Sequence, residues 1–383
     1  MSERGGWHLS AAIAPETDAG AVEDWVRAQS DIVKTDQVEH YWDTLMRQYG
    51  GWFPNGNPTF QEALFGGGDG FQFSDMISGL LSFTLHEIVV NGKLLAMIVI
   101  LTVFSIVLET LQSAFEKTTV SKVAYAVSYL VVVVLAVNSF HIAIQYAQDA
   151  ISNMIHFMVA IMPLVLTMLA SLGNIVTVSI LHPLIVFMIH VVGNMVHFFI
   201  FPLLFFSAVL HIVSTLSDKY KVTQLAKLLR TVAVGTLTVS LTVFLGVISV
   251  QGATGSVTDG VTLKTAKYVA GNFVPVVGRI FSETTDTVLS ASILMKNAIG
   301  LAGVVIIVLL SAFPALKILV LAFIYNLSAA MLQPLGDSPV IGCLQTIGKS
   351  MIFVFAALAT VCLMFFLSIT ILIAAGNVSV MMR

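Results

Sequence analysis

The stretch VAYAVSYLVVVVLAVNSFHIAI, residues 123–144, contains no charged side chain. A helix needs about 20 consecutive apolar residues to cross the hydrocarbon core of a bilayer, so this stretch predicts a transmembrane helix. The whole chain agrees, because 57% of its 383 residues are hydrophobic and only 10% are charged. Soluble domains carry about 25% charged residues. The sequence therefore predicts an all-α, polytopic membrane protein.

Other apolar runs extend this prediction along the chain. Two of them are too long for one span: residues 175–213, which we expect to bend back near Pro202, and residues 298–331, which Pro314 and Lys317 interrupt. The total is about seven to nine spans, and we favour nine. Single spans are also expected at residues 94–111, 154–172, 231–250 and 351–375.

The first 87 residues have a different composition, with 13 acidic and 4 basic side chains, while the remainder has a net charge of +6. Binding to nucleic-acid phosphates requires clustered Lys and Arg, so this acidic excess argues against a nucleic-acid partner. Asp36 and Glu39 have the spacing of a capping box, and Gly50 and Gly51 end the helix that they start. The apolar face of that helix consists of Val38, Trp42, Leu45 and Tyr49.

A second amphipathic stretch, residues 77–89, is typical of a helix that lies on the membrane surface and leads into the first span. We therefore divide the chain into four parts. Residues 1–87 are an acidic extramembrane region, residues 88–250 the first half of the membrane domain, residues 251–297 an outward amphipathic helical segment, and residues 298–383 the second half of the membrane domain.

Lysine and arginine in short loops favour the cytoplasmic side. Lys117 and Lys122 place one loop inside, and the basic linker at residues 217–230 also falls inside when nine spans are counted. The sequence QYAQDAISN, residues 145–153, contains neither residue type and is expected to be an outside loop. With nine spans Arg383 ends inside.

The N-terminal region and residues 257–281 are then outside. An outside N-terminus normally requires an export signal, and residues 1–16 contain no clear apolar segment of that kind. We expect either a truncated signal peptide or a first span that reverses itself during insertion.

The polar stretch VTDGVTLKTAKYVAGNFVPVVGRIF, residues 257–281, is the first candidate site. Spanning the bilayer with several charges would cost about 2.5–3.5 kcal/mol for each charge at its centre. The stretch is therefore either a helix on the membrane surface or, less simply, the wall of an aqueous cavity. Its candidate partner-docking or cavity-lining residues are Asp259, Lys264, Lys267, Arg279, Glu283 and Asp286.

A second candidate is an intramembrane polar stripe at helical spacing. Such a stripe either holds helices together through hydrogen bonds or lines a water-filled or proton-sensitive path. Two of its histidines, seven residues apart, are separated by about 10 Å along a helix, which is too far for one zinc ion unless other helices contribute. The stripe consists of His182, His190, Gly193, Asn194 and His197.

No arrangement of catalytic or metal-binding residues stands out. Cys343 and Cys362 belong to no metal-binding motif, and no nucleophile–base pair or paired carboxylates are evident. We expect no cofactor, no metal and no enzymatic activity. Lys317 beside Pro314 permits a transporter site in a broken helix, although a turn at the inner membrane edge is the simpler interpretation.

Several long stretches resemble the stage III sporulation protein AE family of endospore-forming bacteria, over residues 36–383. They are VEHYWDTLMRQYGG, HEIVVNGKLL, STLSDKYKVTQLAKLLR, GVISVQGATGSVTDGVTLKTAKYVAGNFVPVVGRIFSETTDTVLSAS and FPALKILVLAFIYNLSAAMLQPLGDSPV. The N-terminus departs from the family, which usually begins with a signal peptide.

The resemblance implies a multi-pass protein of the mother-cell membrane that surrounds the forespore. It implies partners from the same operon (an ATPase, ring-forming proteins and membrane subunits) and a forespore-membrane partner. Together these would form a channel-like complex that maintains the forespore and supports its late gene expression. The alternative is an autonomous transporter with a path along the intramembrane polar stripe.

Overall fold

The computed structural model describes residues 36–54, 58–60, 73–114, 119–216, 222–273, 277–336 and 338–381, and within them every regular element is a helix. The elements are α2 (Asp36–Tyr49), η1 (Gly50–Trp52), α4 (Phe73–Val90), α5 (Gly92–Ala114), α6 (Thr119–Ser171), α7 (Ile175–Met195), η2 (Val196–Ile200), α8 (Phe201–Leu216), α9 (Thr223–Phe273), α10 (Val277–Leu332), η3 (Gln333–Leu335) and α11 (Pro339–Met381). The all-α prediction is confirmed.

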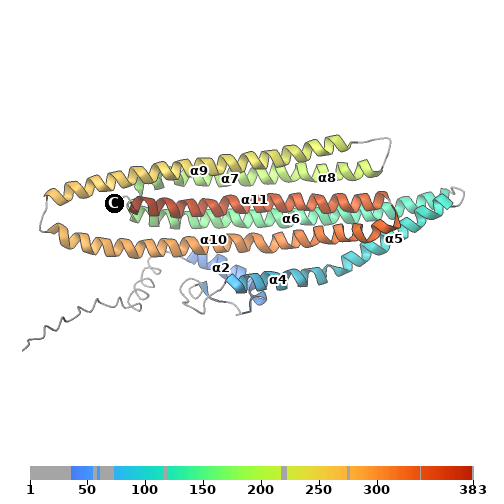
Figure 1. Ribbon diagram of the computed structural model, residues 1–383, viewed down its shortest axis with the longest axis horizontal. Helices are drawn as coiled ribbons and strands as arrows, with labels where there is room; N and C mark the ends of the chain where they lie inside the picture. Colours follow the sequence, from blue (N-terminus) through green and yellow to red (C-terminus); the bar gives the residue numbers. More distant parts are fainter. Residues whose placement is uncertain are drawn as a thin grey trace, which may run out of the picture.

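The long helices lie side by side in an elongated bundle (Figure 1). Helix α11 packs against α6, α9 and α10, while α9 also packs against α7 and α8. The fully buried side chains of Phe157, Phe244, Phe313 and Phe365 belong to this core. Helix α6 has 53 residues and is about 80 Å long, so it exceeds the bilayer core of about 30 Å.

Six helical segments of the described residues are long and apolar enough to cross a membrane. This is fewer than the seven to nine spans predicted from the sequence. The predicted outside loop at residues 145–153 is a continuous part of α6, and the predicted bends at Pro202 and Pro314 are absent because α8 and α10 continue through both prolines. The π-helical turn η2 ends at Ile200, two residues before Pro202. Here the Phe201 N–H donates to the Val196 carbonyl, a wider hydrogen bond than that of an α-helix. The chain stays helical up to the proline.

The topology of the ends also differs from the nine-span prediction. The C-terminal end of α11 lies at the same end of the bundle as the tips of α9 and α10 (Figure 1), and Lys296 Nζ of α10 donates to Asn377 Oδ1 of α11 over 2.6 Å. The described part of residues 257–281 and the C-terminal end of α11 therefore cannot lie on opposite sides of a membrane through the six-helix bundle. The C-terminal ends of α5 and α8, which precede the two loops predicted to be inside, both lie at the other end (Figure 1).

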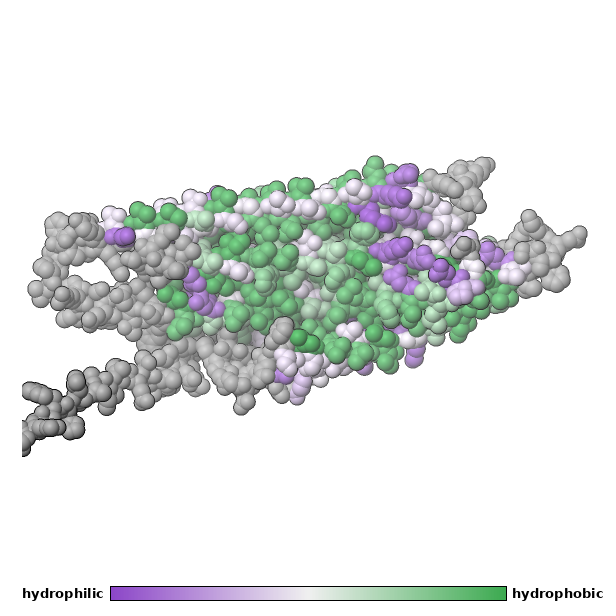
Figure 2. All heavy atoms as spheres, in the orientation of Figure 1, coloured by the Kyte–Doolittle hydropathy of each residue, from purple (hydrophilic) through white to green (hydrophobic). Residues whose placement is uncertain are grey.

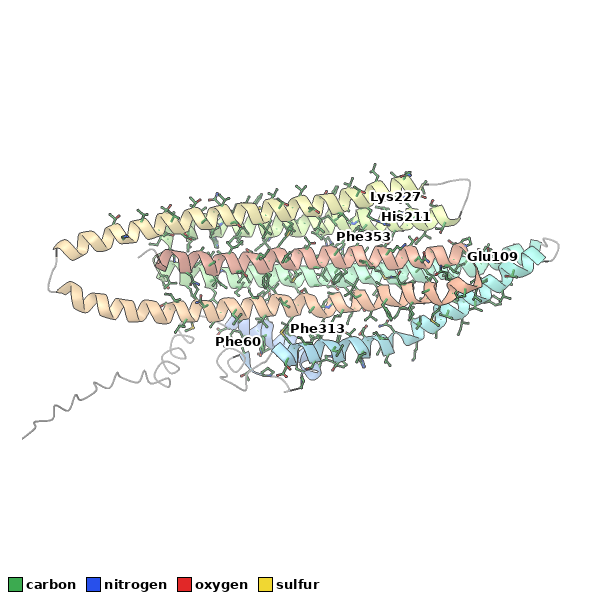
Figure 3. All side chains as sticks on the ribbon, viewed as in Figure 1. Phe60, Glu109, His211, Lys227, Phe313 and Phe353 are labelled. Atoms are coloured by element: carbon green, nitrogen blue, oxygen red, sulfur yellow. The ribbon has the colours of Figure 1, made fainter. Side chains whose placement is uncertain are left out.

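The N-terminal helix forms where the capping-box spacing predicts it, from Asp36 to Tyr49. It is held by aromatic contacts with the bundle: Tyr49 stacks on Phe313 with ring centroids 3.8 Å apart, and the edge of Tyr41 meets Phe157. Trp42 Nε1 donates to the Pro58 carbonyl over 2.8 Å. Figure 3 shows Phe60 and Phe313 on this side of the molecule.

The outer surface has an apolar belt. Figure 2 shows that the face formed by α9, α11 and α10 is hydrophobic along its middle and carries hydrophilic residues toward both ends. On α4, Ile77, Leu81, Leu85 and Val89 are all more than half exposed, as expected of a helix at a lipid boundary. This distribution fits a bundle that crosses a bilayer with both ends in water.

Candidate functional site: a polar face on α6 and α7

A row of polar side chains follows the exposed side of α6. Successive members are three or four residues apart, and each is exposed. The row covers 19 residues, or about 27 Å of rise along the helix, which is close to the thickness of a bilayer core. Its members are Asn138, His141, Gln145, Asp149, Ser152 and His156.

A second row lies on α7 and the adjoining turn η2, and contains most of the predicted intramembrane stripe. His182, His190, Asn194 and His197 are exposed. Gly193 is not part of this surface, because it is buried against the Ile155 side chain of α6, which occupies the space a Cβ would need. The predicted role of these polar residues as an intramembrane stripe stays a prediction, whereas the glycine has a role in close helix packing.

The two rows lie on the same side of the molecule. A helix turns by about 100° per residue, so the α6 row lies about 40–120° around the axis from Ile155, and His190, Asn194 and His197 lie about 40–100° from Gly193 in the same sense. Because α6 and α7 are antiparallel neighbours in contact at Ile155 and Gly193, these rotations turn both rows toward one side. We call the six residues of the α6 row together with His190, Asn194 and His197 the polar face, whereas His182 is turned about 20° the other way from Gly193.

The rest of the surface is different in character. Between Thr231 and Thr262, every exposed residue of α9 is Thr, Val, Gly, Ser or Ala. The exposed threonines bond within their own helix, as when Thr242 Oγ1 donates to the Thr238 carbonyl over 3.0 Å. That surface is compatible with lipid or with an apolar helix, whereas the polar face is not.

Asp149 makes the polar face costly in a bilayer. A carboxylate at the bilayer centre costs about 2.5–3.5 kcal/mol on insertion scales, and hydrocarbon offers no hydrogen bonds to the neighbouring amide and imidazole groups. Polar groups at this depth occur where they meet water or another polar protein surface. The polar face can therefore line an aqueous path or contact a polar partner.

Two histidines of the face have further contacts. His190 Nδ1 lies 2.8 Å from the Val186 carbonyl oxygen, one turn earlier, and the His141 ring meets the edge of Phe205 on α8. Within the part of the chain that the structure describes, no group of three or more His, Cys, Asp or Glu side chains is arranged to hold a metal ion. We assign the histidines no metal.

The residues predicted at 257–281 do not form a separate helix. Their first part is the end of α9 and their last part begins α10. Lys264 is exposed, as predicted, whereas Asp259 is only 2% exposed. The side chains of Lys267, Arg279, Glu283 and Asp286 lie outside the described residues, so their predicted role in docking stays a prediction.

Asp259 has a clear structural role instead. Its two carboxylate oxygens accept hydrogen bonds from the Val176 and Thr177 backbone N–H groups, both at 2.9 Å. These N–H groups belong to the first turn of α7, where they have no partner within the helix and where negative charge is favourable. Asp259 therefore caps α7 from α9, and it is not available for a partner.

Lys317 is neither a broken-helix site nor the marker of a turn, because α10 is continuous around it. Its Nζ lies 5.1 Å from the Tyr146 ring centroid and 6.0 Å from that of Phe83. Such placement stabilises a cation over aromatic faces. Lys317 thus joins α10 to α6 and α4, which excludes both sequence interpretations.

Other polar residues of the bundle are also structural. Glu109 Oε2 accepts a hydrogen bond from Ser338 Oγ over 2.6 Å at the start of α11, and Figure 3 shows Glu109 toward one end of the bundle. Cys343 is buried, and Cys362 Sγ receives a hydrogen bond from Ser311 Oγ over 2.9 Å. Both thiols are free.

The α6 row was missed in the sequence because residues 145–153 were interpreted as a loop. The signal that could have revealed it is the spacing of Asn138, His141, Gln145, Asp149 and Ser152, which recur every three or four residues. A loop needs no such period, whereas one face of a helix does. Reading this period across the predicted loop would have joined two predicted spans into one helix.

Comparisons with known proteins place the chain in a family. A model of the family described as stage III sporulation protein AE matches residues 57–376. The chain is 49% identical over 368 residues to the stage III sporulation protein AE of Bacillus subtilis (strain 168), covering 96% of this chain and 92% of that protein. No solved structure matches the chain.

Proposed function

Because the chain belongs to the stage III sporulation protein AE family, we propose that it is a membrane subunit of a channel-like complex linking mother cell and forespore. A role in sporulation follows from the family, and the six apolar helical segments make the chain a multi-pass membrane protein. Its place in the mother-cell membrane around the forespore is part of the proposal. So are its contributions to forespore maintenance and late forespore gene expression.

The polar face is the observation that carries the proposal. It extends for about 27 Å along α6 and includes an exposed carboxylate, that of Asp149, near the middle of this helix. A protein that only anchored others to the membrane would have no need of such a surface. A channel subunit needs it, because the wall of an aqueous path must present polar groups at bilayer depth.

The proposed partners are the other products of the operon, namely an ATPase, ring-forming proteins and membrane subunits, together with a forespore-membrane protein. The exposed Lys264 at the outer tip of α9 is the described residue best placed for contact across the space between the membranes. We propose no catalytic role, and the family is one of sporulation membrane proteins rather than a known enzyme family.

An autonomous transporter is the second candidate, and it also would use the polar face. The polar face is exposed on the single chain, so a path along it lacks an opposite wall. A transporter that works alone encloses its substrate path between its own helices. This openness favours a subunit whose path is completed by a further polypeptide chain.

Sporulation in a B. subtilis strain that lacks its own relative tests the proposal. The unchanged chain is expected to restore heat-resistant spores and late forespore reporter expression. A variant with Gln145→Leu, Asp149→Leu and Ser152→Leu should reach the membrane in normal amount but restore neither. The matched control is Thr242→Leu, on an exposed apolar side of α9.

Normal spore yield with the triple leucine variant would overturn the proposed role of the polar face. Flux of small solutes or protons in vesicles that contain only the purified protein would instead favour the autonomous transporter. Both assays are needed, because the first tests the role in the cell and the second tests independence from partners.

A further inference from the structure

We infer that two copies of this chain pack against each other through the polar face. In this arrangement the α6–α7 pair of one copy faces that of the other, related by a two-fold axis that runs along the helices. The inference requires only that the bundle spans a membrane. It does not depend on the cargo or on the other partners of the proposed complex.

The first step is that the polar face needs a polar neighbour. Lipid chains cannot accept or donate hydrogen bonds, and six exposed polar side chains of α6 lie within about 27 Å of helix. The Asn, Gln, Ser and His side chains of the face each contain both donors and acceptors or can supply either. A surface of this kind can form hydrogen bonds with a copy of itself.

The second step is that a second copy presents its polar face at the right depth. Two copies inserted in the same direction have every residue at the same level in the bilayer. A two-fold axis along the membrane normal therefore brings identical surfaces together, as in other isologous dimers. It places α6 of one copy opposite α7 of the other, because α6 and α7 lie side by side on each face.

The third step is a charge complement at the middle of the face. The contact between Ile155 of α6 and Gly193 of α7 gives a common reference level. Asp149 lies six residues before Ile155, and His197 lies four residues after Gly193. Because the helices are antiparallel, both residues are displaced toward the same end of the bundle. These offsets are about 9 Å and 6 Å, so the two residues are within about 3 Å in depth. The two-fold arrangement thus sets the Asp149 carboxylate opposite the His197 imidazole of the second copy.

The fourth step is that other occupants fit less well. Among the described residues of the polar face, Asp149 is the single ionisable side chain other than the histidines, so a strongly charged partner would be poorly matched. The polar face lies on the side of α6 away from α11, whereas Leu169 of α6 contacts α11 at Gly376. It is therefore turned away from α11, and the His141 ring contacts only the edge of the bundle at Phe205 of α8.

Disulfide cross-linking between two differently tagged copies tests the inference. Both copies carry Cys343→Ala and Cys362→Ala; one also carries Asp149→Cys and the other His197→Cys. Oxidation in native membranes is expected to give a product of twice the chain mass that carries both tags. The matched control replaces Asp149→Cys with Thr242→Cys, near the middle of α9 and exposed on another side, and should give none.

Absence of the doubly tagged product, while both cysteines still react with a lipid-soluble thiol reagent, would overturn the inference. So would a cross-linked product that contains only one tag and a different protein. If Asp149→Cys fails to accumulate, Gln145→Cys and Ser152→Cys lie on the same row and serve in its place.

A charge swap adds a measurement that does not depend on cysteine. Asp149→His in both copies should lower their co-purification about tenfold for each of the two symmetry-related pairs, because an interhelical hydrogen bond in a membrane contributes roughly 1–2 kcal/mol, equivalent to about a factor of ten. Asp149→His combined with His197→Asp should restore it. No restoration would contradict the Asp149–His197 pair. If the unchanged chain forms dimers but fails to restore sporulation, the result supports this inference and contradicts the proposed function.

Discussion

Two aspartates show how position decides the role of the same side chain. Asp259 is buried and satisfies two backbone N–H groups at the start of α7. Asp149 is exposed in the middle of α6. The first carboxylate stabilises the fold, because it occupies a helix N-terminus where orphan donors point at it. The second is the principal cost of the polar face and hence the strongest reason to expect water or a partner there.

Asp259→Ala is expected to destabilise the bundle. The substitution removes the acceptor for two buried N–H groups, and loss of a helix cap typically costs about 0.5–2 kcal/mol. Thermal unfolding of the detergent-solubilised protein should show a lower Tm. The neighbouring Thr258→Ala is the control, because Thr258 is exposed and bonds only within α9. Equal Tm values for the two variants would contradict the capping role.

Ionisation of Tyr49 is expected to release α2 from the bundle at alkaline pH. Burial, with smaller effects from Glu87 and Tyr146, raises its pKa from 10.0 to about 12. Because the neutral phenol is favoured in the folded state, this contribution to stability is complete below pH 10 and is lost as the pH rises through about 12. The fluorescence of Trp42 should therefore report release of α2 in that range.

Tyr49→Phe retains the ring that stacks on Phe313 but cannot ionise. It should keep α2 docked to higher pH than the unchanged chain. A fluorescence transition at the same pH in both proteins would show that another group controls the release.

At the scale of elements, the continuity of α6 joins two predicted spans and creates the polar face. Cysteine substitutions across residues 145–153 test it. A continuous helix predicts that, in the dissociated monomer in detergent, a water-soluble thiol reagent labels positions 145, 149 and 152 and spares the buried positions 147, 150 and 151. A loop would be labelled along its whole length. Uniform labelling would therefore contradict the helix and restore the loop prediction.

Helix α9 contains glycines of two kinds, which respond differently to alanine. A Cβ at Gly255 would lie 2.9 Å from the Thr177 Cα atom, whereas one at Gly246 would meet nothing within 4 Å. Gly255→Ala should lower the Tm because α7 must move away. Gly246→Ala should raise it, since alanine is favoured over glycine in a helix by about 0.8–1.0 kcal/mol. A stabilised Gly255→Ala would contradict the close contact of α7 and α9.

At the scale of the whole molecule, the six-helix arrangement fixes which ends share a side of the membrane. Lys264 of α9 and Ala374 of α11 are exposed near the same end of the bundle, and Lys227 of α9 is exposed near the other (Figure 3). Cysteines at positions 264 and 374 should react with a membrane-impermeant reagent from the same side. A cysteine at position 227 should react from the opposite side. If the cysteines at positions 264 and 374 react from opposite sides, an odd number of spans must lie between them, which would contradict the six-helix arrangement.

Much of the local structure was predictable because its causes are local. The N-terminal helix begins at Asp36 and ends near Gly50 because the capping box and the two glycines act over a few residues. The histidine row on α7 was recognised from its spacing alone. In contrast, Pro202 and Pro314 were expected to end helices, and both are accommodated, since neighbouring helices and the π-turn η2 stabilise the surrounding backbone.

Sequence alone determined that this chain is an all-helical membrane protein of a sporulation family, because hydropathy and motif content need no knowledge of contacts. Only the tertiary structure decided the number of long helical segments, the shared side of the α9–α10 tips and the C-terminal end, and the union of two polar rows into one face. The physical reason is that hydropathy along a chain measures the cost of placing each residue in lipid, whereas the direction in which a side chain points depends on which neighbours cover its helix.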